Sequence, residues 1–304
     1  MSLIGDLTRA DKFLEGNVKE LEKKIIKNYQ DALKAVRALI AETAYEKYGG
    51  SYNDLLKYDR LGTIEKELMG EIHKLTGKNA TSLKAGLAAH FTDSFRYTSF
   101  AVENEIGIKI GLGAVNPKVI EKSVLNPLDR IGYLRRNKLN QAKMAQGIQE
   151  TLTQGLIQGK SYTDVAKGIK GKMDIGASDA LRIANTEMHR VQSEARQESF
   201  TDAFDKGVNA NKRWISALDD TTRDAHAEVD GQEVGVNEPF IVSGEELMYP
   251  GDPRGSAGNV INCRCSHIIV IKGYEPEVRR ARDDAEKSGK LIKYQNYDEW
   301  DKDR

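Results

Sequence analysis

Residues 12–48, KFLEGNVKELEKKIIKNYQDALKAVRALIAETAYEKY, decide the fold class of this chain. Their apolar side chains form one stripe that advances 26 residues in seven steps, and this mean spacing of 3.7 residues is typical of an amphipathic α-helix. The stripe consists of Leu14, Val18, Leu21, Ile25, Tyr29, Leu33, Val36 and Ile40. Because Gly49-Gly50 is a typical helix stop, the sequence predicts a helix of roughly 55 Å over 12–48. Such a length favours an elongated, partner-binding region over a compact enzyme core.

Two further apolar patterns predict helices before residue 100. One begins near Ile64 and is expected to end at Gly77, because glycine favours helix termination. The other is expected to begin near Thr81 and to continue to Thr98. Residues 105–115 combine several glycines with alternating apolar positions, which fits either a loop or a short strand.

Two Asn-Pro pairs mark the helices that follow. Asn116-Pro117 and Asn126-Pro127 each place an N-capping side chain before a proline that suits the first helical position. The second pair is expected to open a helix that extends to Leu156 and is broken near Gly147 or Gly155.

Two more helices are predicted before residue 208. Ser161 and Asp164 have the spacing of a capping box, with aspartate in place of the usual glutamate, and they begin a short helix that ends near Lys172. Ser178 is expected to cap the next helix, and Gly207 is expected to end it. The first two-thirds of the chain is therefore predicted to be almost entirely helical.

The pattern of the sequence changes after Gly207. Residues 212–218 and 266–271 have the composition of strands, and the residues between them are rich in turn-forming Gly, Pro, Asp and Ser. We therefore predict an α+β fold class, with a mostly helical, elongated N-terminal two-thirds and a small loop-rich α+β C-terminal domain. The expected segments are a helical region with the long amphipathic helix at 1–124, a second helical region at 125–207, the loop-rich domain at 208–272 and a charged tail, packed through its aromatic side chains, at 273–304.

Charge is unevenly distributed along a chain whose 46 basic and 46 acidic side chains cancel. Residues 109–172 hold 12 basic and 4 acidic side chains, whereas residues 201–304 hold 15 and 21. A basic middle segment suits contact with a polyanion such as DNA, although a solvated helix face is the plainer interpretation. No apolar run approaches the roughly 18 residues of a membrane span, and the N-terminus lacks the layout of a signal peptide. We therefore expect a protein that is made and kept in a cytoplasm.

The chain has only two cysteines, Cys263 and Cys265, which excludes a disulfide framework. In an extended strand they would face the same side, and with His226 they would offer three ligands to zinc, with His267 or Asp252 as a fourth. A metal would stabilise a small domain that has a thin core. The usual spacing of zinc-binding cysteines is C-x₂₋₄-C, however, so two thiols packed as small buried hydrophobic groups are the alternative.

A catalytic interpretation of the same side chains is weaker. Either cysteine could act as a nucleophile and His226 as its base, with an aspartate to orient the histidine, but no signature of a thiol protease surrounds them. Asp219-Asp220 is more typical of a turn than of a catalytic pair. Arg223 and Arg264 are expected to hold loops together through salt bridges, although a guanidinium also suits carboxylate or phosphate binding.

The C-terminal motifs, taken in order, resemble the Mu F-like minor head protein family of tailed bacteriophages. The first of these motifs is Arg182-Ile-Ala-Asn-Thr-Glu187 and the last is Asn262-Cys-Arg-Cys265. The resemblance covers roughly residues 125–272. The residues that carry it are Thr186, Glu187, Trp214, Arg223, His226, Asp230, Gly231, Pro250, Gly251, Asp252, Asn262, Cys263, Arg264 and Cys265. Asn185 departs from the family pattern, which often has arginine or another residue there.

The resemblance implies a minor capsid protein without catalytic activity that acts in head morphogenesis. Such a protein would bind the portal protein at the portal vertex inside the procapsid and assist head assembly or DNA packaging and delivery. Scaffold or major capsid protein and packaged double-stranded DNA are further expected partners, and no membrane contact is expected. The expected location is the virion interior, and the host cytoplasm during assembly. The rival interpretation is a zinc- or cysteine-dependent hydrolase or toxin-like module in the C-terminal domain; apart from a structural zinc, no cofactor is expected.

Overall fold

In the computed structural model, residues 3–57, 60–125, 132–273, 277–283 and 288–302 are described. Long helices precede residue 206 and short strands follow it, which confirms the predicted α+β class with a mostly helical N-terminal two-thirds and a small α+β C-terminal part. The long helices are α1 (Leu3–Ile40), α3 (Leu61–Ile106), α5 (Tyr133–Ile157) and α6 (Tyr162–Asp205). Shorter elements between them are the π-helix η1 (Ala41–Glu46), α2 (Tyr52–Lys57) and α4 (Pro117–Leu125).

The chain forms two compact units, each made of segments that are distant in the sequence. The mixed unit comprises Met1–Val18, Gly86–Gly132 and Asn185–Arg304. The bundle unit comprises Lys19–Ala85 and Tyr133–Ala184. Helices α1, α3 and α6 each contribute residues to both units, so these units divide the chain differently from the four consecutive segments expected from the sequence.

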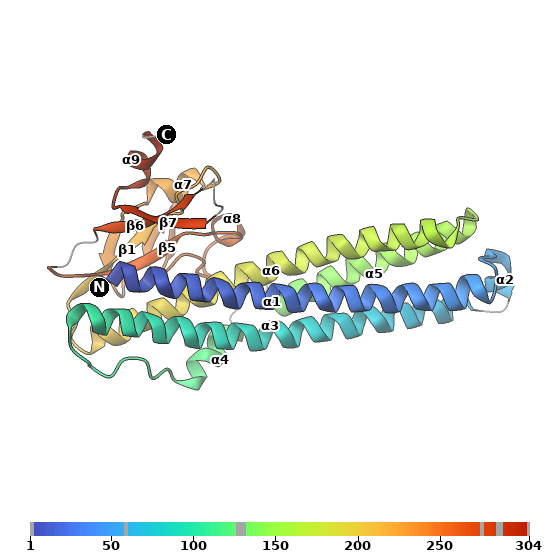
Figure 1. The fold of residues 1–304 in the computed structure, drawn as a ribbon, viewed down its shortest axis with the longest axis horizontal. Coiled ribbons are helices and arrows are strands. Elements are labelled where there is room, and N and C mark those ends of the chain that lie inside the picture. Colours follow the sequence, from blue (N-terminus) through green and yellow to red (C-terminus); the bar gives the residue numbers. More distant parts are fainter. Residues whose placement is uncertain (1–2, 58–59, 126–131, 274–276, 284–287, 303–304) are drawn as a thin grey trace. The chain divides into compact units, whose positions relative to one another are not determined.

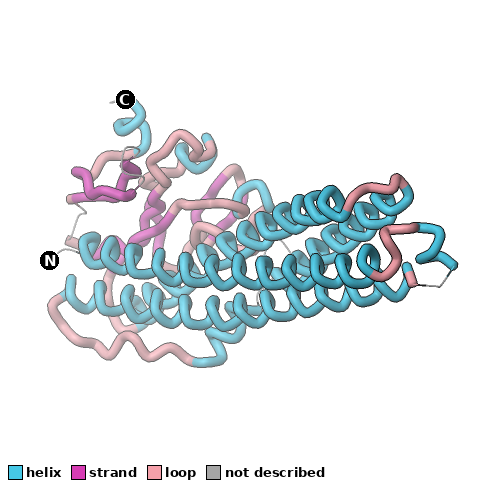
Figure 2. The backbone as a smooth tube through the Cα atoms, turned by 45° about the vertical axis from the view of Figure 1, so that its right-hand side comes forward, coloured by secondary structure: helices cyan, strands magenta, loops and turns pink. Residues whose placement is uncertain are grey.

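In the bundle unit, segments of α1, α3, α5 and α6 lie side by side (Figure 1, Figure 2), and the unit also contains η1 and α2. The predicted apolar stripe of α1 faces their common core, where Ile25 and Ile40 are 2% and 0% exposed. Polar contacts also hold the helices together. The Tyr29 hydroxyl and the Asn140 side-chain amide each donate a 2.8 Å hydrogen bond to the carbonyl oxygen of Gly176.

The first helix begins earlier than the predicted residue 12. Leu3, Ile4 and Leu7 are buried in the core of the mixed unit, and this packing extends α1 to Leu3. At its other end α1 continues into η1, and the left-handed Gly49, with a φ of 58°, follows as predicted.

Two predicted interruptions by glycine, an end at Gly77 and a break near Gly147 or Gly155, are wrong. Helix α3 continues through Gly77, and α5 continues through Gly147 and Gly155. None of these glycines adopts the positive φ of a helix C-terminus, and the apolar face continues on both sides of each. Gly155 serves packing instead, because a Cβ atom there would lie 2.4 Å from Cγ2 of Val165 on α6.

Helix α6 is also a single helix, so the predicted end near Lys172 and the predicted cap at Ser178 are wrong. The Ser178 hydroxyl donates a 3.1 Å hydrogen bond to the carbonyl oxygen of Asp174, as an internal helical residue does. The predicted start is confirmed. Ser161 Oγ accepts from the backbone N–H of Asp164 (3.2 Å) and donates to its carboxylate (2.7 Å), which satisfies a free N–H of the first turn.

Other predicted boundaries are settled by local contacts. The Asn116 side chain accepts a 2.9 Å hydrogen bond from the backbone N–H of Lys118, which confirms the cap of α4. Gly207 has a φ of 94° and follows α6, as expected of a helix stop. Residues 107–116 form a loop rather than a strand. The expected start at Asn126-Pro127 lies outside the described residues, and α5 is described from Tyr133.

The mixed unit contains a three-stranded antiparallel sheet with the strand order β2-β1-β5. Its strands are β1 (Ala210–Ile215), β2 (Glu233–Gly235) and β5 (Ser266–Ile271). Both predicted strands are therefore confirmed, although the first begins and ends earlier than the predicted 212–218. Two hairpins pair β3 (Phe240–Val242) with β4 (Glu245–Leu247) and β6 (Val278–Asp283) with β7 (Ser288–Lys293). The short helices are α7 (Asp224–Glu228), α8 (Ala257–Val260) and α9 (Tyr297–Lys302).

The main core of the mixed unit lies between its helices and the sheet. Apolar residues of α1, α3 and α6 pack there against β1 and β5. The fully buried members are Ala101, Val102, Phe200 and Ala203, and four consecutive residues of β5, Ile268 to Ile271, join them. The sheet is therefore fixed to the ends of three long helices.

The predicted charged tail contains more regular structure than its sequence indicated. It forms the β6-β7 hairpin followed by α9, and the rings of Tyr297 and Trp300 pack with centroids 5.5 Å apart. Arg279, one of its charged residues, is only 2% exposed. An ion pair with Asp230 compensates this burial.

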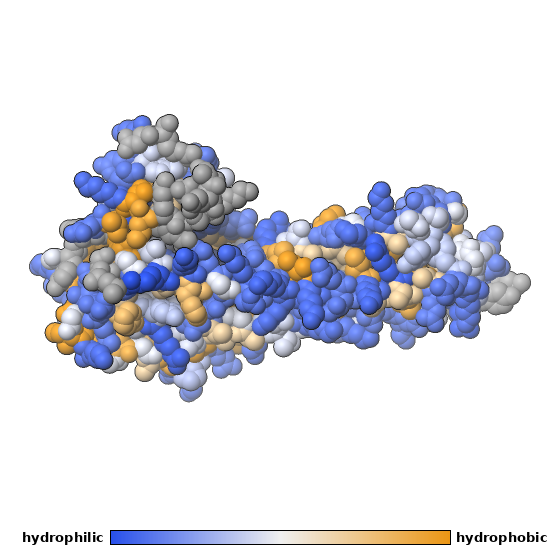
Figure 3. Space-filling view, in the orientation of Figure 1, coloured by the Kyte–Doolittle hydropathy of each residue, from blue (hydrophilic) through white to orange (hydrophobic). Residues whose placement is uncertain are grey.

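The surface carries mostly hydrophilic residues over the helices on the face shown in Figure 3, with apolar residues in smaller groups. Single exposed apolar residues of this kind are normal on folded proteins. Within the described residues, no helix combines the length and the apolar character that a membrane span requires.

Candidate functional site

Two turns bring the cysteines and His226 together. Asn262, directly before Cys263, adopts a left-handed conformation with a φ of 58°, which asparagine tolerates better than most side chains. The N–H of Cys263 donates a 3.2 Å hydrogen bond to the carbonyl oxygen of Val260 at the end of α8. Arg223, at the start of α7, donates from Nη2 to the carbonyl oxygen of Ile261 (2.5 Å). This bond joins α7 to the turn that carries the cysteines.

The three predicted metal-ligand candidates form one buried cluster. His226 Nδ1 lies 3.4 Å from Cys265 Sγ and 3.7 Å from Cys263 Sγ. All three ligand atoms lie within 4.8 Å of one another, and the residues are only 1%, 2% and 4% exposed. Both sulfurs therefore converge on the same ring nitrogen from residues 37 and 39 positions away in the sequence.

Hydrogen bonding acts on the two thiols in opposite directions. The hydrogen bond between the two free thiols lowers the pKa of Cys265 and raises the pKa of Cys263. Burial opposes the lowering at Cys265 and adds to the raising at Cys263. A backbone N–H of Ala217 and the ring of His226 also favour the Cys265 thiolate. Negative charge is thus stabilised at Cys265 Sγ, next to His226 Nδ1.

Apolar side chains enclose this cluster. Trp214, which is fully buried, meets the His226 ring edge to face at a centroid distance of 5.7 Å, and it meets Phe240 at 5.4 Å. Both cysteines belong to the same hydrophobic cluster as these two aromatic residues. Burial of the cysteines among apolar groups and their convergence on His226 were alternatives in the sequence analysis. The structure combines both properties.

Neither residue considered as a fourth ligand joins the cluster. The His267 ring packs against Phe200 and Phe240, with centroid distances of 5.3 and 6.4 Å. The Asp252 carboxylate accepts hydrogen bonds from the N–H of Met248 (2.7 Å) and from Arg254 (2.7 Å), so it shapes its own turn.

The cluster lacks the features of a thiol enzyme. His226 Nε2 has no hydrogen-bond partner among the described residues, so no carboxylate orients the ring as in a catalytic triad. Both sulfur-bearing residues are almost completely buried, which removes the accessible surface that a reactive cysteine needs.

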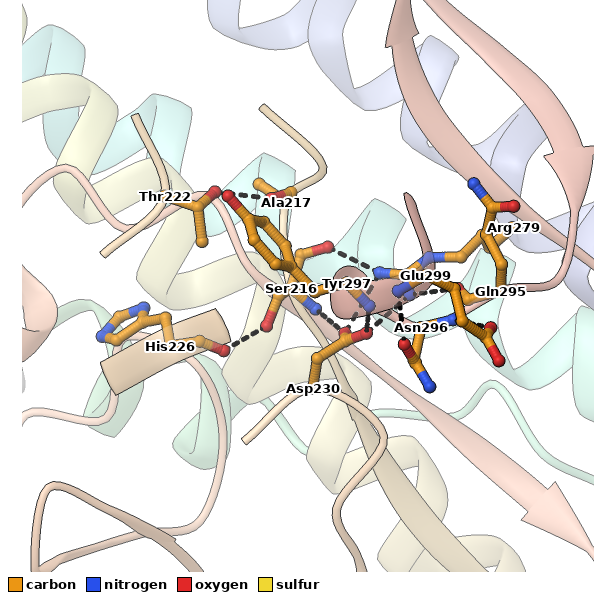
Figure 4. A network of polar contacts seen from close by, with 10 residues as sticks. All are labelled: Ser216, Ala217, Thr222, His226, Asp230, Arg279, Gln295, Asn296, Tyr297 and Glu299. Atoms are coloured by element: carbon orange, nitrogen blue, oxygen red, sulfur yellow. Dashed lines mark hydrogen bonds and ion pairs between the residues drawn. The ribbon is translucent and has the colours of Figure 1, made fainter. Parts of the chain in front are cut away.

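A second group of residues centres on Asp230 (Figure 4). Its carboxylate accepts from the backbone N–H groups of Ser216 and Tyr297, both at 2.7 Å, and from Arg279 at 2.7 and 3.1 Å. Arg279 also donates to the carbonyl oxygens of Ser216 (2.8 Å) and Gln295 (2.7 Å). Asp230 therefore ties β1 to the C-terminal segment, a structural role for one of the residues that carry the resemblance.

A third group lies on α6. Glu187 is fully buried and forms a 3.0 Å ion pair with Arg190, which also binds Glu194 (2.7 Å) and the carbonyl oxygen of Ser123 (2.7 Å). Gly251, with a φ of 86°, packs next to Arg190, where a Cβ atom would be in ordinary van der Waals contact at 3.5 Å from the Cα atom.

The remaining residues that carry the resemblance shape turns or bind neighbouring loops. Arg264 makes the expected salt bridge, with Asp219 at 2.8 Å. Gly231 has a φ of 80°, and its N–H donates to the carbonyl oxygen of Trp214 (3.0 Å). Thr186 on α6 and Pro250, next to Gly251, are buried. The residues that carry the resemblance are therefore distributed over several structural contacts. Four of them, Trp214, His226, Cys263 and Cys265, meet in the cluster around the two cysteines.

Sequence reasoning missed Lys212, which lies on β1 and is fully buried. Its Nζ donates to Gln197 Oε1 (3.1 Å) and to the carbonyl oxygen of Met248 (2.8 Å), and burial lowers its pKa to about 7. The alternation of β1 contained the signal, because Lys212 has the same parity as the buried Ala210 and Trp214.

Comparisons with known proteins cover both units of the chain. A family model described as Phage Mu protein F like protein matches residues 146–268. Minor head protein GP7 of Bacillus phage SPP1 is 32% identical over 302 residues, which make up 97% of this chain and 96% of that protein. The NAD(+)--arginine ADP-ribosyltransferase EFV of Enterococcus faecalis is 27% identical over 95% of this chain but only 58% of its own length. The uncharacterized protein YqbB of Bacillus subtilis is 30% identical over 43% of this chain and 44% of its own length. No solved structure matches the chain significantly.

Proposed function

Because the chain belongs to the phage Mu protein F-like family, we propose that it is a minor head protein of a tailed bacteriophage. It binds the portal vertex inside the procapsid and assists head assembly or DNA packaging and delivery. The observation that carries this proposal is that the similarity to the SPP1 minor head protein extends through both units instead of ending with the F-like segment.

An exposed aromatic patch on the mixed unit supports a protein partner. Phe13 of α1 and Tyr97 and Phe100 of α3 are 47%, 38% and 58% exposed, and the rings of Phe13 and Tyr97 have centroids 5.0 Å apart. Aromatic side chains are enriched in protein interfaces, where burial removes their apolar surface from water. We assign this aromatic patch to contact with the portal protein.

The proposed role involves no catalysis. The enterococcal relative carries the word ADP-ribosyltransferase in its name, but 42% of that protein lies outside the region that aligns with this chain. We place its named activity in that additional part. The burial of His226, Cys263 and Cys265 supports the same view for thiol chemistry.

A co-purification experiment tests the portal assignment. The full chain, expressed together with the portal subunit of the same phage, is expected to be retained by a tagged portal at moderate salt. Phe100→Asp is expected to abolish this retention, because it places a charge in the aromatic patch. Ile175→Asp, a change at a 63% exposed residue of the bundle unit, is the matched control and is expected to leave retention unchanged.

Portal binding and the minor head role are tested by different results. Absence of retention for the wild-type chain would refute portal binding. Absence of the chain from purified virions and procapsids would refute the minor head role itself. Transfer of ADP-ribose from NAD⁺ to arginine by the purified chain would refute the proposed lack of catalysis.

A further inference from the structure

We infer that His226, Cys263 and Cys265 bind one Zn²⁺ ion that stabilises the mixed unit. This metal site goes beyond the proposed head function and does not depend on it. The three side chains come from α7 and from the turn between α8 and β5, so an ion would connect elements that are distant in the sequence.

The distances between the ligand atoms fit a tetrahedral zinc ion. With Zn–S bonds of about 2.3 Å and a Zn–N bond of about 2.05 Å, a tetrahedral angle separates nitrogen from sulfur by about 3.6 Å. The observed separations of His226 Nδ1 are 3.4 Å from Cys265 Sγ and 3.7 Å from Cys263 Sγ. A ring nitrogen has either one lone pair or one proton, so it is not suited to two hydrogen bonds at once. The approach of two sulfurs to the same nitrogen therefore favours a metal ion bound by all three atoms.

Backbone hydrogen bonds fix the turn that carries the two cysteines. The N–H of Cys263 donates to the carbonyl oxygen of Val260 (3.2 Å), and Arg223 at the start of α7 donates to the carbonyl oxygen of Ile261 (2.5 Å). Contacts of this kind hold the ligand-bearing residues in place around a metal site. When Nδ1 binds a metal, the ring proton lies on Nε2, and the packing against Trp214 then fixes the ring.

The chemistry of the ligands selects the metal. Two thiolates and one imidazole are soft or borderline ligands that suit zinc, whereas magnesium and calcium require oxygen ligands. No fourth histidine, cysteine or carboxylate of the described residues belongs to the group, so a water molecule or a backbone oxygen completes the coordination.

The position of the site indicates a structural role. The hydrophobic cluster around Trp214 and Phe240 is small, and the loops between β1 and β5 contain only short helices and strands. A metal ion bound by α7 and by the turn before β5 would hold these loops together where little apolar surface is buried.

Metal analysis of the full-length protein tests the site directly. Protein expressed with added zinc and dialysed is expected to contain one zinc per chain, and chelation is expected to lower its thermal unfolding temperature. Reconstitution with Co²⁺ is expected to give a sulfur-to-metal charge-transfer band and the strong visible bands of a tetrahedral ion. His226→Gln and Cys265→Ser are expected to bind no stoichiometric metal.

His90→Gln is the matched control, because His90 is equally buried, lies on α3 and is not part of the cluster. It is expected to retain one zinc per chain. A wild-type protein that binds neither zinc nor cobalt, or one whose bound metal survives both cluster substitutions, would overturn the inference. Since the cobalt spectrum is measured on the wild-type chain, this conclusion does not depend on the folding of any variant.

Discussion

Asp230 and Arg279 form an ion pair, 2.7 Å long, in which both side chains are only 2% exposed. The two residues are separated by 49 positions and join β1, through Ser216, to the C-terminal β6-β7 hairpin. A buried pair of this kind is costly to form but much more costly to leave half complete. The C-terminal segment is therefore an integral part of the mixed unit, and its loss should destabilise the sheet.

Arg279→Leu should destabilise the mixed unit by about 3–5 kcal/mol, because the Asp230 carboxylate would remain buried without its partner. Both tryptophans, Trp214 and Trp300, lie in this unit, so their fluorescence during urea unfolding measures the change. Lys206→Leu removes an ion pair with Asp202 in the same unit, with side chains 35% and 32% exposed, and should alter stability by less than about 1 kcal/mol. Equal effects of the two substitutions would show that the buried pair has no special role.

Gly155→Ala should destabilise the bundle unit by about 1–3 kcal/mol, because the added Cβ atom would lie 2.4 Å from Cγ2 of Val165. The control is Gly171→Ala on α6, where a Cβ atom meets nothing within 4 Å. That substitution should stabilise the helix by up to about 1 kcal/mol, since alanine has the higher helix propensity. Urea unfolding followed by far-UV circular dichroism gives both values. A stabilising effect of Gly155→Ala would contradict the close packing of α5 and α6.

Lys212 should make the stability of the mixed unit depend on pH above neutrality. Burial lowers its pKa to about 7, compared with 10.5 for the free side chain. Between these values the unfolded chain binds more protons than the folded chain, so the free energy of unfolding rises with pH, by at most about 1.4 kcal/mol per unit. The slope disappears above about pH 10.5, where both states are neutral.

Lys212→Met removes this titration and should flatten the profile. The variant should therefore lose stability relative to the wild type as the pH rises, because only the wild type gains free energy of unfolding from the titration. At every pH it also leaves Gln197 and the carbonyl oxygen of Met248 without their donor. Urea unfolding at pH 7, 8 and 9 measures the difference between the two proteins. A difference that stays constant with pH would show that Lys212 keeps an ordinary pKa in the folded chain.

Local signals predicted the elements whose causes are local. The apolar stripe identified the buried face of α1, including Ile25 and Ile40, and the strand-like composition of 212–218 and 266–271 located β1 and β5. The sequence could not show that α3 passes through Gly77, because a glycine ends a helix only if the chain around it adopts a left-handed turn. Packing of the flanking apolar residues decides this, and packing depends on the other helices.

The cluster of possible metal ligands and the salt bridge of Arg264 were predictable from residue type, whereas the buried contacts of Arg279 and Lys212 were not. His226 and the two cysteines are rare residues, and their chemistry suggests a common site before any fold is known. Arg279 is one of many charged residues near the C-terminus, and nothing in its neighbours connects it to Asp230. Lys212 was not singled out, because lysine is usually exposed, although its parity on the strand placed it inward with Trp214.

The two serines expected to cap helices allow a final test, because only one of them is at a helix start. Ser161→Ala should destabilise the bundle unit by about 1 kcal/mol, since it removes the acceptor of the Asp164 N–H. Ser178→Ala should be neutral or slightly stabilising, because Ser178 lies inside α6 and alanine is the better helix former. Far-UV circular dichroism during urea unfolding compares both variants with the wild type. If Ser178→Ala were as harmful as Ser161→Ala, residue 178 would be a true cap and α6 would be two helices.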